Sequence, residues 1–206
     1  MEFVEPFIKY FVLYFVAIDP LGTVAIFLTI LPNINEKKNK VAYEAIGYAF
    51  LILVFFLFFG RFVLNHLNIA LYSFKIAGGI ILFLISIEML MNKRVKRRES
   101  FMKNEKVFSA IYPLAVPLLA GPASITSVIV LSSAIKYENI VSILLQILAL
   151  FIVMLITLLS FMITIKYEKF INSKLLQVFS RIIAILLCAL SIQFILDGIY
   201  SFNKTL

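Results

Sequence analysis

Apolar residues form long blocks along this chain, separated by short polar segments. The blocks cover approximately residues 7–30, 42–64, 71–91, 110–133, 140–165 and 178–199. About 20 apolar residues in a helix cross the ~30 Å hydrocarbon core of a bilayer. The pattern therefore predicts an all-α, polytopic membrane protein with six transmembrane helices. Because no linker is long enough to fold separately, we expect one domain over residues 1–206.

Composition supports this interpretation and excludes several kinds of site. Hydrophobic residues make up 63% of the 206 positions, which leaves too little polar surface for a soluble domain of this length. Cys188 is the only cysteine, so the chain forms no internal disulfide. His66 is the only histidine, which gives little support to an all-histidine metal site or a Ser-His-Asp triad in the membrane. We expect no metal and no cofactor.

The distribution of basic residues predicts the orientation. The segments after the first, third and fifth blocks, with their edges, hold 14 of the 19 lysines and arginines. Positive residues are retained on the cytoplasmic side, so both termini are expected outside the cell. The net charge of +8 then points to anionic lipid headgroups as a partner and not to nucleic acid.

The first block contains the unusual stretch "FVAIDPLGTVAIF", with Asp19, Pro20 and Gly22 near its centre. A carboxylate is costly in hydrocarbon, and proline and glycine weaken a helix. The same residues are well suited to start a helix, because aspartate caps free N–H groups and proline fits the first helical position. We therefore expect two half-helices that are broken near Asp19. The alternative is a simple proline kink with Asp19 as its cap.

A related stretch, "LLAGPASITSV", lies in the fourth block, where Gly121 and Pro122 align with Asp19 and Pro20. We expect a second break near Gly121 and a second half-helix that starts at Pro122. Residues 1–96 and 104–206 then form two repeats of three spans each. Because three is odd, the repeats face opposite ways, which gives a 3+3 inverted repeat with helices 1 and 4 interrupted, as in many secondary transporters.

Two half-helices that start at mid-depth suit an anionic ligand. Each start presents free N–H groups and a partial positive charge. The substrate-binding candidates lie at or near the two breaks, except for one deep residue of the sixth span: Asp19, Pro20, Gly22, Thr23, Gly121, Pro122, Ser124, Thr126 and Gln193. The serines and threonines could instead bond back to their own helices, and Gln193 could bond across helices. Asp19 and Glu88 are the candidates for coupling to an ion.

These motifs, with "FKIAGGIILFLISIEML" and "SRIIAILLCALSIQFILDGI", resemble the MarC family of prokaryotic inner-membrane proteins across all six blocks. The family usually has Asn where this chain has Thr23, Pro where it has Ala25, and Gly where it has Ala123. The resemblance implies transport of small neutral amino acids such as glycine and alanine, coupled to a cation gradient. The first motif then maps onto Asp19, Pro20, Gly22 and Thr23. The second maps onto Gly121, Pro122 and Ser124.

The sequence leaves other functions open. An exporter or channel for other small solutes or drugs would share this architecture. An intramembrane aspartyl hydrolase would need Asp19 and Asp197 close together, although Asp197 lies near a span end. Because no metalloprotease, nucleophile-elbow or phosphate-loop motif is present, we expect no enzyme. The expected partners are a zwitterionic amino acid, a proton or sodium ion, lipid, and a second copy of the chain.

Overall fold

The computed structural model describes residues 3–34, 37–91, 110–133, 140–168 and 173–204. Helices α1 and α2 form the first block, and a short 3₁₀ turn, η1, follows them. The remaining described residues form the helices α3, α4, α6, α7 and α8, and an irregular segment, η2, lies between α4 and α6. The bounds are α1 Val4–Ile18, α2 Pro20–Ile30, η1 Leu31–Asn33, α3 Lys38–His66, α4 Leu71–Leu90, η2 Leu114–Leu119, α6 Pro122–Ser133, α7 Ile140–Lys166 and α8 Ser173–Asn203. The all-α prediction is confirmed.

Among the described residues, five segments are long and apolar enough to cross a membrane. They are the combined segment Val4–Ile30 and the helices α3, α4, α7 and α8. Helix α6 is apolar but has only 12 residues. The chain is therefore a multi-pass membrane protein, and its described part contains five full-length spans and a shorter sixth segment.

The predicted fourth span, residues 110–133, was wrong as a pair of regular half-helices. Its second half is α6, which begins at Pro122 as expected. Its first half contains the irregular segment η2, in which Val116 is extended, with φ −127° and ψ 126°. Proline has no N–H to donate and disfavours the helical region for the residue before it. Pro117 therefore excludes a regular helix at Val116.

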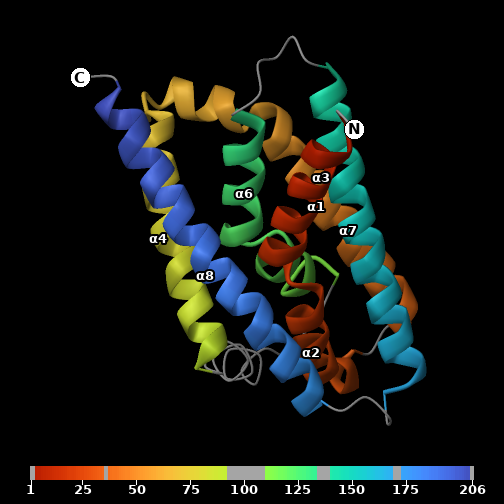
Figure 1. The fold of residues 1–206 in the computed structure, drawn as a ribbon. Helices are drawn as coiled ribbons and strands as arrows, with labels where there is room; N and C mark the ends of the chain where they lie inside the picture. The colour runs from red at the N-terminus through yellow and green to blue at the C-terminus, as the bar shows by residue number, and fades with distance from the viewer. Residues whose placement is uncertain (1–2, 35–36, 92–109, 134–139, 169–172, 205–206) are drawn as a thin grey trace.

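Helices α4 and α8 pack along most of their lengths and run in opposite directions (Figure 1). Glycines allow this close approach. A Cβ atom on Gly79 would lie 2.7 Å from the Ser191 carbonyl oxygen of α8, and one on Gly198 would lie 2.9 Å from the Tyr72 carbonyl oxygen of α4. Both distances are shorter than real Cβ contacts. The two helices therefore form a tight pair beside the broken first helix.

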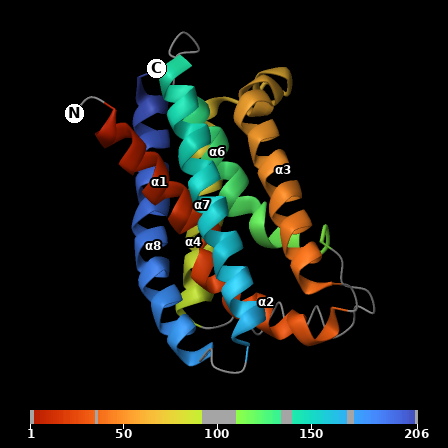
Figure 2. The same cartoon turned by 90° about the vertical axis from the view of Figure 1, so that its right-hand side faces the viewer.

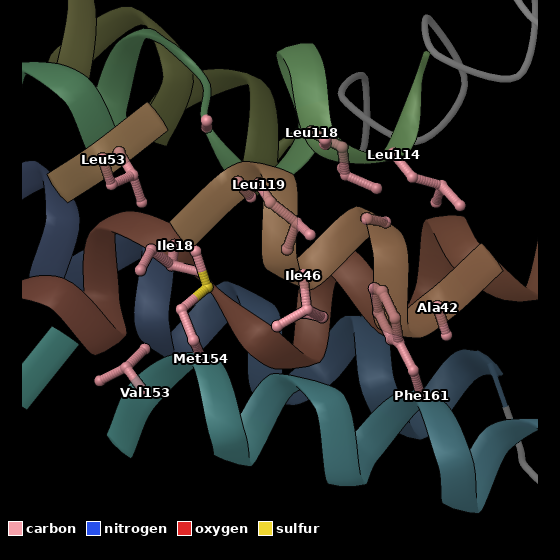
Figure 3. Close-up of a cluster of buried hydrophobic side chains, with 14 of the residues drawn as sticks. Ile18, Ala42, Ile46, Leu53, Leu114, Leu118, Leu119, Val153, Met154 and Phe161 are labelled. Carbon is pink, nitrogen blue, oxygen red and sulfur yellow. The ribbon is translucent and has the colours of Figure 1, made fainter. Parts of the chain in front are cut away.

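The broken helix α1–α2 lies at the centre of the bundle. In its most apolar stretch 72% of the residues are buried, compared with 28–33% in the other four long spans. Its largest core cluster joins α1 and α2 to α3, α7 and η2 (Figure 3). The rings of Phe27 and Phe161 stack there with centroids 4.2 Å apart. Packing from several elements therefore holds both halves of the broken helix.

The start of α1 and the end of α8 lie at the same end of the bundle (Figures 1 and 2). This arrangement is the one expected for an even number of crossings. Most of the basic segment between α4 and η2, residues 92–109, lies outside the described residues. The outer faces of α3, α7 and α8 carry many exposed phenylalanine, leucine and isoleucine side chains, as expected for surfaces that contact lipid.

Candidate functional site

The first break occurs at Asp19, which has left-handed backbone angles of φ 51° and ψ 69°. Aspartate tolerates this conformation better than most residues, because its short side chain bonds locally. Its N–H donates to the Phe15 carbonyl and closes α1, with an N···O distance of 2.9 Å. Its Oδ1 accepts from the Gly22 N–H at 3.0 Å, and Pro20 fills the first position of α2. The predicted capping and the predicted break are both confirmed.

The Asp19 side chain is completely buried and binds two elements at once. Its Oδ1 caps α2, while its Oδ2 accepts a hydrogen bond from Ser180 Oγ of α8 at 3.2 Å. A carboxylate at this depth is costly unless other groups bind it. Asp19 is therefore a buried acidic group held between the second half of the broken helix and α8.

Gly22 leaves the space that the Asp19 carboxylate occupies. A Cβ atom built on Gly22 would overlap Asp19 Oδ2 and would lie 2.8 Å from Ser180 Oγ. No larger residue fits while the carboxylate keeps its place. The glycine in this motif therefore makes room for the Asp19 carboxylate at the start of α2.

The second break lies between η2 and α6. A Cβ atom on Gly121 would strike the Pro117 carbonyl oxygen, so the backbone of η2 passes close to this glycine. Ser124 Oγ donates to the Leu119 carbonyl at 2.7 Å and ties the first turn of α6 to the end of η2. The break therefore depends on a glycine and a serine of the motif that the sequence singled out.

Both breaks lie near mid-depth. At 1.5 Å per residue, α2 is about 16 Å long and α6 about 18 Å, or roughly half of a bilayer core each. The two half-helices run from their breaks toward opposite ends of the bundle (Figure 1). Helix α1 packs on α6, and Val16 and Ala123 belong to one buried cluster. The two breaks are therefore neighbours in the interior.

The two half-helix starts differ in charge. Asp19 occupies the start of α2 with its own carboxylate. Gly121 has no side chain with which to cap α6, and no acidic residue lies in the first turn of that helix. The first N–H groups of a helix have no acceptor within it. The start of α2 therefore already has an acidic group of its own, whereas the first turn of α6 has none.

Most of the predicted site residues are buried near the breaks, but not all of their polar groups are available. Thr23 is buried, and its hydroxyl donates to the Pro20 carbonyl of its own helix at 2.8 Å. Thr126 is buried with its methyl group against Gly78 of α4. Pro122 is exposed. The hydroxyls of Thr23 and Ser124 therefore bond to backbone carbonyls at the two breaks, and this use makes them structural.

The structure does not bring Gln193 to the breaks. Its side chain is exposed on α8, where Nε2 donates to Asp197 Oδ1 at 2.8 Å. Ser180, which contacts Asp19, lies about 20 Å from Gln193 along the same helix.

Glu88, the second coupling candidate, is partly buried close to the end of α4 and so is not at mid-depth. Within the described ranges, no cluster of three or more His, Cys, Asp or Glu residues could hold a metal ion.

The sequence analysis missed a buried polar chain that joins α1, α7 and α6. The Tyr14 hydroxyl donates to Gln146 Oε1 at 3.3 Å, and Gln146 Nε2 donates to the Leu131 carbonyl at 3.1 Å. Tyr14 and Gln146 are completely buried. The signal was present, because a glutamine inside an apolar helix usually bonds across helices.

We expect Gln146→Leu to lower the free energy of unfolding by about 1–3 kcal/mol, because it leaves the Tyr14 hydroxyl without its acceptor and the Leu131 carbonyl without a donor. Ser160→Ala is the matched control on α7, since the Ser160 hydroxyl donates only to the Ile156 carbonyl of its own helix. Thermal unfolding of both variants in detergent measures the difference. Equal stability of the two variants would show that the hydrogen bonds of Gln146 contribute nothing to the free energy of unfolding.

Comparison with known proteins extends over almost the whole chain. The description "MarC family integral membrane protein" matches residues 4–202. A UPF0056 membrane protein of Aquifex aeolicus is 30% identical, over 98% of this chain and 96% of its own length. Another, from Methanocaldococcus jannaschii, is 34% identical over 93% of this chain and 97% of its own length. No solved structure matches the chain.

Proposed function

Because this chain belongs to the MarC family of integral membrane proteins, we propose that it is a secondary transporter of small neutral amino acids, of the size of glycine or alanine. The observation that carries the proposal is the pair of mid-depth helix breaks, one of which holds the buried carboxylate of Asp19. Interrupted helices at corresponding positions of two halves are typical of transporter binding sites. Irregular backbone at this depth is tolerated where it is buried in protein or lines a cavity.

The architecture of the proposed transporter is a 3+3 inverted repeat, with both termini outside the cytoplasmic membrane. The opposite directions of α2 and α6 from neighbouring breaks support this arrangement (Figure 1). The charge distribution of the sequence supports the orientation.

The difference between the two breaks suggests how a zwitterion is oriented. The substrate carboxylate binds at the start of α6, where first-turn N–H groups and the helix dipole favour negative charge. The substrate ammonium lies toward Asp19, the acidic group at the neighbouring break. Attraction between opposite charges then favours a single orientation. A bound amino acid therefore bridges the two breaks.

Asp19 is also the group that we propose couples transport to a proton or sodium ion. Intramembrane carboxylates commonly mark proton and ion pathways in transporters. Asp197 does not share this role, since it lies on the exposed part of α8, about 26 Å along the helix from Ser180. That separation favours transport over hydrolysis by an aspartyl pair.

We expect purified protein in liposomes to accumulate labelled glycine or alanine, and to do so faster under an imposed proton or sodium gradient. Protein-free liposomes are the control. Uptake that shows no dependence on either gradient would contradict coupling, and absence of uptake would contradict the proposed function.

Thermal unfolding in the presence of ligands separates the substrate classes. A ligand at 100 times its Kd stabilises the protein by about 2.7 kcal/mol. We expect glycine and alanine to raise the midpoint of unfolding. A rise with hydrophobic drugs and none with amino acids would favour the drug exporter instead.

A further inference from the structure

Ser180 of α8 lies in neither of the two motifs, yet it contacts the central acidic group. Its Oγ donates to Asp19 Oδ2 at 3.2 Å. Because Asp19 Oδ1 already caps the start of α2, the two carboxylate oxygens have different partners. One oxygen binds the broken helix, and the other binds a helix from the opposite half of the chain.

The Ser180 hydroxyl departs from the usual behaviour of serine in a helix. In an apolar helix a serine or threonine hydroxyl commonly bonds back to a carbonyl three or four residues earlier. Thr157 and Ser191 do this, bonding to Val153 and Cys188. Ser180 instead bonds across helices to a residue 161 positions away.

The close approach at Gly22 explains why this contact forms. A Cβ atom on Gly22 would lie 2.8 Å from Ser180 Oγ, so the serine lies directly over the glycine of the first motif. Helices α2 and α8 pack against each other along this contact. The absence of a side chain at Gly22 lets α8 approach closely enough for its serine to reach the carboxylate.

We propose that Ser180 is a positioning residue that holds Asp19 Oδ2 in place for the coupling cation or the substrate ammonium. This role in transport rests on the proposed function. The bond makes the orientation of the carboxylate depend on the position of α8. The Ser180 Oγ to Asp19 Oδ2 distance of 3.2 Å is longer than in most O–H···O hydrogen bonds, so the serine orients the carboxylate without binding it tightly. A shift of α8 relative to α2 would then break the bond between Ser180 and Asp19 Oδ2.

The transport test compares Ser180→Ala with Ser180→Thr, which retains a hydroxyl. We expect Ser180→Ala to raise the cation concentration for half-maximal uptake by about tenfold, which corresponds to 1.4 kcal/mol, and we expect Ser180→Thr to restore most of the loss. Ser191→Ala is the control, because Ser191 is a buried serine of the same helix that bonds only to its own backbone. A Ser180→Ala variant with the cation dependence of Ser191→Ala would overturn the proposal.

A stability measurement tests the contact without relying on transport. We expect Ser180→Ala to lower the midpoint of thermal unfolding when Asp19 is present, and to have a smaller effect in an Asp19→Ala background, because contacting residues are not additive. Equal shifts in the two backgrounds would overturn the proposed contact. If the native protein takes up no amino acid, the proposed function fails, and this cycle still decides whether Ser180 positions Asp19.

Discussion

Asp19→Asn is expected to abolish coupled amino-acid uptake while the protein still folds. Asparagine is as good a helix cap as aspartate and also tolerates the left-handed conformation that the break requires. The substitution therefore keeps the Gly22 cap and the break but removes the charge. Losing one partner of a buried charge pair costs about 2–5 kcal/mol, so uptake in proteoliposomes should fall by about 30-fold or more.

Asp19→Ala separates the capping role from the charge. Alanine loses the cap, which costs about 1 kcal/mol, and must also adopt the positive φ of 51°, which costs about 1–2 kcal/mol. We therefore expect Asp19→Ala to unfold at a lower temperature than Asp19→Asn, although both variants fail to transport. Coupled uptake by Asp19→Asn at the native rate would remove the Asp19 charge from the mechanism and leave it as a helix cap.

Gly22→Ala is expected to reduce uptake by about tenfold or more and to lower the midpoint of thermal unfolding. The added methyl group would overlap Asp19 Oδ2, which lies at the end of a side chain and can move aside. The displaced carboxylate then loses its contacts with the Gly22 N–H and Ser180 Oγ. The better helix propensity of alanine, about 1 kcal/mol, offsets only part of this loss, because a buried carboxylate without its partners is costly.

Gly47→Ala is the matched control for this prediction. Gly47 is also a helical glycine, but a Cβ atom there meets no atom within 4 Å. This variant should transport normally and be slightly more stable, since only the helix propensity changes. If the two glycine variants transport equally well, the position of the Asp19 carboxylate does not limit transport.

The two helix starts could be predicted from the sequence because each depends on a few adjacent residues. Asp19 and Pro20 contain the cap and the fixed φ that begin α2, and Pro122 begins α6 in the same way. The irregular form of η2 could also have been predicted, because Pro113 directly precedes this segment and Pro117 lies within it. The prediction of a regular half-helix there gave apolar length more weight than the missing proline N–H groups.

The partners of the buried polar groups could not be predicted in this way. Ser180 follows Asp19 by 161 positions, and nothing in its local sequence distinguishes it from serines that bond to their own helix. Two glutamines also show that the sequence does not reveal which polar side chains are buried. Gln193 was a site candidate but lies exposed beside Asp197, whereas Gln146 is completely buried against Tyr14.

The sequence by itself determined that this chain is a multi-pass helical membrane protein and where its first and fourth segments begin a new helix. Apolar length, capping and the proline ring act over one or two helical turns, so the residues nearby are sufficient. The tertiary structure alone decided which face each helix turns inward and which side chain meets Asp19. Those contacts join residues far apart in the chain, and they depend on how closely two helices approach at positions such as Gly22.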